Sequence, residues 1–229
     1  NATIKNCTFD KDGLYLVSTE NSSLTNNLFN TYTIPLNIYL NSSFNLFYNN
    51  NISSSDSIKI YQDLQRNNYL VYNNSFGMIN WSKSNLSTNI NLTVGQNIFL
   101  SSNLIGLIDS SNTKNLNSSA NIAFYNLNYN SSLQPYLLKN GVRCDNIPAL
   151  CNITSYDNVS GTLVAQVASF SNYSTQENIP PVTNSCGDII DSVSLTANVV
   201  SNGTCFNIKS SNLVLDCAGF SINYSVNGS

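Results

Sequence analysis

Apolar residues along this chain come in short runs broken by Asn, Ser and Thr, without the three- and four-residue spacing of an amphipathic helix. One short pattern, an apolar residue followed two positions later by Asn and five positions later by another apolar residue, occurs four times. It begins at Ile4, Leu24, Phe47 and Val71, and its Asn positions lie 20, 23 and 24 residues apart. The pattern predicts an all-β chain with an internal repeat.

A period of this length, with a short strand, an Asn at a turn and a second short strand, is what one rung of a parallel β-helix requires. Rungs stack about 4.8 Å apart, apolar residues form inward columns, and Asn tolerates the left-handed turn geometry while hydrogen-bonding in a ladder. We expect Phe9, Phe29 and Phe76 to point inward and Tyr48 and Tyr72 outward. The alternative is a set of ordinary hairpins in a polar β-sandwich.

The pattern changes after Trp81 and predicts four segments. Residues 1–90 are expected to form parallel β-helix rungs, and alternating strands in residues 91–177 favour a separate small β-sandwich. Residues 178–185 contain two prolines and are expected to form a stiff linker. Residues 186–229 return to the solenoid pattern.

The composition narrows the class of protein. Hydrophobic residues make up 41% of the 229, enough for a sizeable core, whereas only 9% are charged and 42 are Asn. A net charge of -3, without a basic stripe, excludes a nucleic-acid partner. No apolar run approaches eighteen residues, so no membrane span is expected in this segment. The sequence opens on Asn1 without Met, so we expect that an upstream segment was removed or that the chain comes from a longer protein.

Sugar is the expected source of solubility, because the chain contains seventeen Asn-x-Ser/Thr acceptor triplets. The alternative is that such triplets arise by chance in a chain rich in Asn and Ser. The candidate N-glycosylation sites are Asn1, Asn6, Asn21, Asn41, Asn51, Asn73, Asn80, Asn85, Asn91, Asn117, Asn130, Asn152, Asn158, Asn172, Asn202, Asn223 and Asn227.

Two regions carry a family resemblance. Gly203-Thr204-Cys205-Phe206 followed by residues 212–222, Asn-Leu-Val-Leu-Asp-Cys-Ala-Gly-Phe-Ser-Ile, resembles the opening rungs of right-handed parallel β-helix surface proteins. These are related in fold to pectate lyases and NosD-like repeat proteins and are abundant among archaeal cell-surface proteins. Residues 116–122, 140–144 and 168–173 are similar to the immunoglobulin-like module that follows such β-helices. The resemblance implies right-handed parallel β-helix segments plus an immunoglobulin-like β-sandwich.

The order of the rungs is permuted relative to that family, in which the Leu-Asp-Cys rung precedes the Ile-x-Asn-Cys rung. Here Cys217 lies near the end and Cys7 near the beginning. Joining the end to the beginning restores the order. We therefore expect a repeat unit whose residues 186–229 stack on residues 1–90 of the next identical unit, head to tail.

The cysteine pattern indicates disulfides in an oxidising exterior, because the chain has no His and no Cys-x-x-Cys spacing. Cys144 and Cys151 form a natural local pair. Cys186 and Cys205 are 19 residues apart, as are Cys217 and the Cys7 of a following unit, and both separations are close to one rung. In the alternative pairing Cys205 bonds to Cys217, and Cys7 and Cys186 remain unpaired unless those two meet. The expected disulfide residues are Cys7, Cys144, Cys151, Cys186, Cys205 and Cys217.

Few residues of this chain are suited to catalysis, and we expect no catalytic residue, no metal and no cofactor. The absence of His removes Ser-His and Cys-His systems. A lyase-like site would have only Lys59, Arg66 and Lys83 beside isolated carboxylates. The run from Asp10 to Gly13 echoes the start of an EF-hand, but a glycine turn between rungs explains it better.

The sequence therefore predicts a structural repeat unit of an extracellular, cell-surface glycoprotein fibre, sheath or surface layer. Its expected partners are identical neighbouring units and covalently attached N-glycans, with no nucleic acid. The alternative is a cell-surface adhesin that binds a glycan or a host surface through a flank of the β-helix. A degenerate polysaccharide lyase is a third reading.

Overall fold

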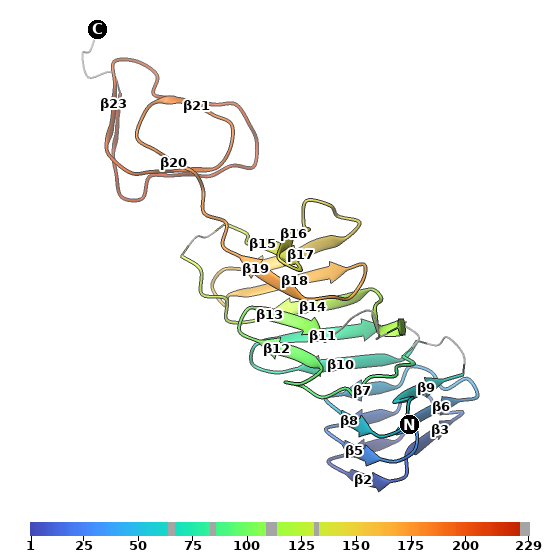
Figure 1. Ribbon diagram of the computed structural model, residues 1–229. Helices are drawn as coiled ribbons and strands as arrows, with labels where there is room; N and C mark the ends of the chain where they lie inside the picture. Colours follow the sequence, from blue (N-terminus) through green and yellow to red (C-terminus); the bar gives the residue numbers. More distant parts are fainter. Residues whose placement is uncertain (64–66, 83–85, 109–113, 131–132, 225–229) are drawn as a thin grey trace. The chain divides into compact units, whose positions relative to one another are not determined.

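The computed structural model describes residues 1–63, 67–82, 86–108, 114–130 and 133–224. It is all-β apart from one short 3-10 turn, η1 (Lys114–Leu116), among these residues (Figure 1). The chain divides into two compact units, residues 1–177 and residues 178–229. The two units are described separately below.

The first unit begins as a parallel β-helix, in which three strands make one rung and each strand pairs in parallel with the equivalent strand of the next rung (Figure 1). We call its three sides face 1, face 2 and face 3. Face 1 contains β1 (Thr3–Lys5), β4 (Ser23–Thr25), β7 (Leu46–Tyr48) and β10 (Tyr69–Asn73). Face 2 contains β2 (Thr8–Lys11), β5 (Leu28–Thr31) and β8 (Asn51–Ser54). Face 3 contains β3 (Leu14–Val17), β6 (Leu36–Tyr39) and β9 (Ile60–Gln62).

Apolar columns fill the inside of these rungs, as the repeat predicts. On face 1, Ile4 pairs with Leu24, which pairs with Phe47, and the last two are 0–1% exposed. On face 2, the rings of Phe9 and Phe29 stack with centroids 4.6 Å apart. Neighbouring rungs approach closely at Gly13, where a Cβ would lie 2.0 Å from the carbonyl oxygen of Ile34. This position therefore requires glycine.

Side-chain amides form ladders at the corners of the solenoid. At the corner before face 2, the backbone N–H of Cys7 donates to Asn27 Oδ1 (2.9 Å), and the N–H of Asn27 donates to Asn50 Oδ1 (3.0 Å). Asn26, just before Asn27, has a φ of 52°, the left-handed conformation that Asn tolerates. This confirms the expected Asn ladder. A second ladder, at the corner before face 1, joins Ser22, Asn45 and Asn68.

The sequence pattern sets the start of the fourth repeat one residue later than the strand pairing does. Leu70, and not Val71, lies opposite Phe47. Tyr72 is therefore buried at 1% exposure, with its hydroxyl donating to the carbonyl of Asn50 (2.8 Å), and the prediction that it points outward is wrong. Phe76 was expected in the inward column but is 44% exposed, because the strand direction reverses there.

Face 1 continues into an antiparallel region without a break. Its last strand, β10, pairs antiparallel with β11 (Gly77–Ser82), and the sheet then adds β14 (Ala120–Phe124), β18 (Thr162–Val167) and β17 (Cys151–Asp157). We call this eight-stranded sheet the long sheet. Single antiparallel bridges join Leu92 to Ile52 on face 2 and Thr88 to Ile60 on face 3. The segment around residue 90 is therefore part of the solenoid wall.

A second antiparallel sheet covers this region. It contains β12 (Ile98–Ser101), β13 (Leu104–Leu107), β19 (Tyr173–Gln176), β15 (Tyr136–Lys139) and β16 (Val142–Arg143). The ring of Trp81 in β11 packs against that of Phe170, with centroids 4.7 Å apart, and the Phe170 ring packs against Tyr173 of β19, with centroids 5.9 Å apart. The two sheets therefore share one interior. One apolar core runs from Leu16 to Tyr173. Sheet and core therefore both cross residues 90 and 91, where the sequence predicts the start of a separate β-sandwich.

The second unit is again a parallel solenoid, but small. Its strands are β20 (Val182–Thr183), β22 (Val193–Leu195) and β25 (Leu215–Asp216) in one sheet, β21 (Gly187–Ile189) and β24 (Phe206–Ile208) in another, and β23 (Val199–Ser201) and β26 (Ile222–Tyr224) in a third. All these pairs are parallel. Part of the expected linker, residues 182–183, therefore belongs to the first rung.

Candidate functional sites

The first rung of the first unit presents three unpaired strand edges. Among the described residues, β1, β2 and β3 each pair with one neighbour only, the equivalent strand of the second rung. Ile4, Phe9 and Leu14 of this rung are half-buried and pack against the core. The rung therefore offers both backbone hydrogen-bonding groups and apolar side chains that a further rung would cover.

The last described rung of the second unit has the same character. There, β25 pairs only with β22 and β26 only with β23. Leu215, Cys217 and Ile222 are half-buried and pack against the small core formed by Leu195, Val199 and Cys205. Each of these two rungs thus has an open edge on which a parallel strand could be added, and the first rung of the second unit, at β20 and β21, has another.

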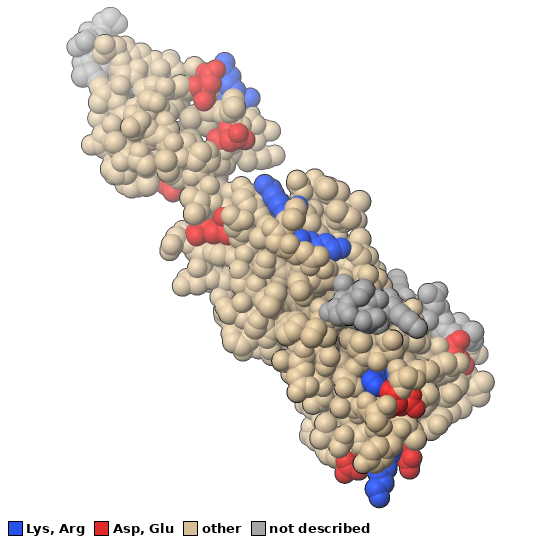
Figure 2. All heavy atoms as spheres, viewed as in Figure 1, with Lys and Arg blue, Asp and Glu red and all other residues tan. Residues whose placement is uncertain are grey.

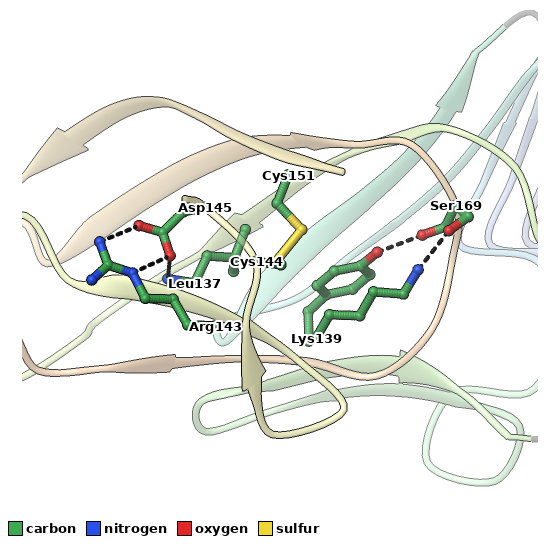
Figure 3. Close-up of a disulfide and its surroundings, with 8 residues drawn as sticks. Leu137, Lys139, Arg143, Cys144, Asp145, Cys151 and Ser169 are labelled. Carbon is green, nitrogen blue, oxygen red and sulfur yellow. Dashed lines mark hydrogen bonds and ion pairs between the residues drawn. A yellow bond between two sulfur atoms is a disulfide. The ribbon is translucent and has the colours of Figure 1, made fainter. Parts of the chain in front are cut away.

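The structure contains two disulfides, and both join cysteines that the sequence spacing had paired. Cys144 and Cys151 close a short loop of the first unit beside the ion pair of Arg143 with Asp145 (3.1 Å; Figure 3). Cys186 and Cys205 join two stacked rungs of the second unit, with Cα atoms 4.6 Å apart.

The two remaining cysteines, Cys7 and Cys217, are free thiols. Cys7 is exposed and immediately precedes β2, on the first rung of the first unit. Cys217 is half-buried and immediately follows β25, on the last described rung of the second unit. Each free thiol therefore lies on one of the two unpaired rungs described above.

The candidate glycosylation sites are kept apart from the interior Asn residues. Of the seventeen, Asn85 and Asn227 lie outside the described residues, Asn73, Asn80 and Asn91 are half-buried, and the others are exposed. The fully buried Asn residues are Asn27, Asn37, Asn45, Asn50 and Asn68, and none of these begins an Asn-x-Ser/Thr triplet. The twelve exposed triplets thus lie where a sugar could be attached without opening the core.

Face 3 carries an outward row of tyrosines that the sequence pattern did not reveal. The ring centroids of Tyr15 and Tyr39 are 6.1 Å apart, and those of Tyr39 and Tyr61 are 5.3 Å apart. Asn37 lies between Tyr15 and Tyr61 in register yet is only 1% exposed. Desolvation by burial, and then the neighbouring Tyr61, Tyr15 and Asp63, raise the pKa of Tyr39 above its usual value. We call Tyr15, Tyr39 and Tyr61 the tyrosine row.

Charged residues are few and scattered over the visible surface (Figure 2). Of the three candidate lyase residues, Arg66 and Lys83 lie outside the described residues. Lys59 is buried, and its ammonium group donates to the backbone carbonyls of Ser54 (2.9 Å) and Asp56, so it is engaged in holding a turn. Within the described ranges, no three His, Cys, Asp or Glu side chains gather as metal ligands would.

No helix in the described part of the chain is both long enough and apolar enough to cross a membrane. No protein-family model, curated protein or solved structure matches this chain.

Proposed function

We propose that this chain is a structural, non-catalytic repeat unit of an extracellular glycoprotein fibre, sheath or surface layer. In this arrangement the last rung of residues 186–229 in one copy stacks on the first rung of residues 1–90 in the next. The observation that carries the proposal is the pair of unpaired parallel edges, one in each unit, each with half-buried apolar side chains and one free cysteine. Because the two edges differ, contact between them is head to tail, and it builds an open filament unless the rotation between copies closes a ring.

The two free cysteines, Cys7 and Cys217, could make this contact covalent. Cys7 lies three positions after the half-buried Ile4 and directly after the left-handed Asn6 (φ 55°). Cys217 lies two positions after the half-buried Leu215 and directly before the left-handed Ala218 (φ 47°). Stacked rungs bring equivalent Cα atoms within disulfide range, as Cys186 and Cys205 do at 4.6 Å. The two thiols would lose two protons and two electrons to an external disulfide oxidant, forming one S–S bond between copies.

Three properties of the chain support an extracellular surface location. Its two disulfides suit an oxidising compartment. The exposed Asn-x-Ser/Thr triplets could carry N-glycans, which would supply the solubility that few charges provide. The proposal that the segment belongs with archaeal surface proteins rests on the resemblance in residues 203–222 alone.

We further infer that the antiparallel region follows an immunoglobulin-like order. The order β11, β14, β18 and β17 matches strands A, B, E and D, and β16, β15 and β19 match C′, C and F in the second sheet. The Tyr173 hydroxyl donates to the Ser169 carbonyl near the start of β19, as in a tyrosine corner. The order departs from that fold in one respect, because the hairpin of β12 and β13 occupies the place of strand G.

Assembly of the purified, oxidised protein tests the main proposal. We expect concentration-dependent linear particles by electron microscopy, and a peptide containing Cys7 linked to one containing Cys217 in a non-reducing digest. The variant Ile4→Lys places a charge in the half-buried column of the edge and should abolish assembly. Val142→Lys is the matched control, because Val142 is 70% exposed on the edge strand β16.

A protein that stays monomeric at every concentration, or a digest that links Cys7 to Cys186 within one copy, would contradict the proposal. If particles form equally well with Cys7→Ser, stacking is supported and the covalent link is rejected. Melting curves of both variants separate lost assembly from lost folding.

The tyrosine row favours a second candidate function, that of an adhesin that binds a glycan or host surface through face 3. Aromatic rings at a surface suit the apolar face of a sugar ring. The substitution Tyr15→Ala should then abolish binding to immobilised glycans, whereas Tyr32→Ala, at another tyrosine that is 74% exposed, should leave binding intact. Absence of binding by the unmodified protein across neutral and acidic glycans would reject this function.

A further inference from the structure

A hollow of about 480 Å³ lies between three strands of the long sheet and the loop closed by the Cys144–Cys151 disulfide. Its size is in the range of small-molecule sites. None of its lining residues is charged, so it suits a neutral polar group. The lining residues are Ser119, Ala120, Asn121, Pro148, Ala149, Leu150, Asn152, Gln166, Val167 and Ala168.

Three side-chain amides cross this site in register. Asn121 of β14 lies opposite Gln166 of β18, which lies opposite Asn152 of β17. Their neighbours in these strands, Ala120, Val167 and Cys151, are buried, so the amides are on the outer face of the sheet. Each amide offers two N–H donors and a carbonyl acceptor, which is the chemistry that sugar hydroxyl and acetamido groups require.

The opposite wall of the hollow is a loop held in place by the disulfide and by backbone hydrogen bonds. The N–H of Ala168 donates to the carbonyl of Leu150 (2.9 Å), and the N–H of Leu150 donates to the carbonyl of Ile147 (2.8 Å). Leu150 is still 41% exposed. The hollow therefore combines an apolar wall with polar amides, as sites for sugar rings do.

Asn152 is itself a candidate glycosylation site, since Asn152-Ile153-Thr154 is an acceptor triplet and its side chain is exposed. Because Asn152 lines the hollow, a sugar attached to its Nδ2 would start at the wall of the hollow. We propose that the hollow holds the first sugars of an N-linked glycan on Asn152, with Gln166 and Asn121 as hydrogen-bond partners and Leu150 as an apolar contact. This goes beyond the proposed assembly and rests only on its glycoprotein part.

The rate at which a glycan-releasing amidase removes sugar from the native protein tests this site. Asn158 provides an internal control, because it is exposed in the turn that follows the same strand, β17. Glycopeptide mass spectrometry should find Asn152 occupied, with its sugar released roughly tenfold more slowly than that of Asn158, as one or two hydrogen bonds would produce. Unfolding the protein should make the two rates equal.

The variant Gln166→Ala should raise the release rate at Asn152 toward that at Asn158, while Gln176→Ala, on β19 outside the hollow, should not. Gln166 is exposed, so its truncation leaves the core intact. Equal native rates, an unaffected rate in Gln166→Ala, or an unmodified Asn152 beside occupied sites elsewhere would each overturn the proposal for the hollow alone. Absence of sugar at every triplet would overturn it together with the glycoprotein part of the proposed function, whereas assembly is measured independently.

Discussion

The two solenoid regions of this chain use the same rung geometry but are stabilised in different ways. In the first unit, stacked rungs enclose columns of buried side chains such as Leu24, Phe29 and Phe47. In the described part of the second unit, the buried apolar cluster contains Leu195, Val199 and Cys205, and Ile189 and Val193 are buried outside it. Because so small a unit buries little apolar surface, we expect its disulfide to supply a large share of its stability.

The difference is concentrated at one corner position, the residue just before a parallel strand. Asn27 and Asn50 precede β5 and β8, and Cys186 and Cys205 precede β21 and β24. At this position amide hydrogen bonds link neighbouring rungs in the first unit and a covalent bond links them in the second. The second unit keeps an amide link at another corner, where the N–H of Ser221 donates to Asn198 Oδ1 (2.8 Å). Cys7, which precedes β2, places a cysteine in the amide ladder of the first unit. Its backbone N–H donates to Asn27 Oδ1, and its free thiol is the one that the proposed bond between copies would use.

Emptying the core should have the largest effect and should affect the first unit only. Phe47→Ala removes a fully buried ring from the face 1 column and is expected to lower the free energy of unfolding of residues 1–177 by about 3–5 kcal/mol. Tyr48→Ala, at the adjacent half-buried outward position, should cost much less. Denaturant titration with hydrogen exchange resolved by unit measures both. An equal cost for the two variants would refute the assigned register.

Removing the disulfide between Cys186 and Cys205 should destabilise the second unit and leave the first unit unchanged. Cys205→Ser opens a link between residues 19 apart and is expected to destabilise residues 178–229 by about 3 kcal/mol. Limited proteolysis should then cut these residues while residues 1–177 stay protected. If the second unit keeps the resistance of the unmodified protein, packing alone suffices there and the contrast drawn above is wrong.

The amide ladder should contribute less than the core, but measurably. Asn50→Ala removes the oxygen that accepts from the N–H and the side chain of Asn27, and also the donor to the Leu24 carbonyl (2.9 Å). Leaving such buried groups unpaired costs about 1–3 kcal/mol. Asn30→Ala, at an exposed Asn of β5, is the control and should be nearly neutral in thermal unfolding.

The smallest expected effect concerns Tyr72, whose pKa burial raises far above the usual value. A folded-state pKa above that of the unfolded chain gives stability that is complete below about pH 10 and is lost as pH rises further. Tyr72→Phe should cost about 1 kcal/mol at neutral pH, since the Asn50 carbonyl loses a donor, and should weaken the alkaline loss of stability. Unfolding curves from pH 7 to 11 test this. Identical alkaline slopes would show that Tyr72 ionises without unfolding.

The sequence predicted the features that depend on short-range chemistry. The recurrence of an apolar residue two positions before Asn gave the rungs at Ile4, Leu24 and Phe47, because a left-handed turn and an inward column impose that local spacing. The spacing of Cys186 and Cys205 gave a disulfide for the same reason, since one rung returns the chain to the same corner. The pattern failed at Val71, because the observed register begins at Leu70 and has Tyr72 in place of the Asn that defines the motif.

Only the tertiary structure decided the features that depend on distant segments. The continuation of face 1 through β11, β14, β18 and β17 joins strands that are far apart in sequence. Local sequence patterns therefore could not reveal that one sheet continues past residue 90. The tyrosine row and the amides of Asn121, Gln166 and Asn152 are likewise brought together by strand register. Local sequence fixes which residues can turn, stack or pair within a rung, because those choices involve a few adjacent dihedral angles. Which strands then become neighbours depends on burial summed over the whole core, which no short window of sequence contains.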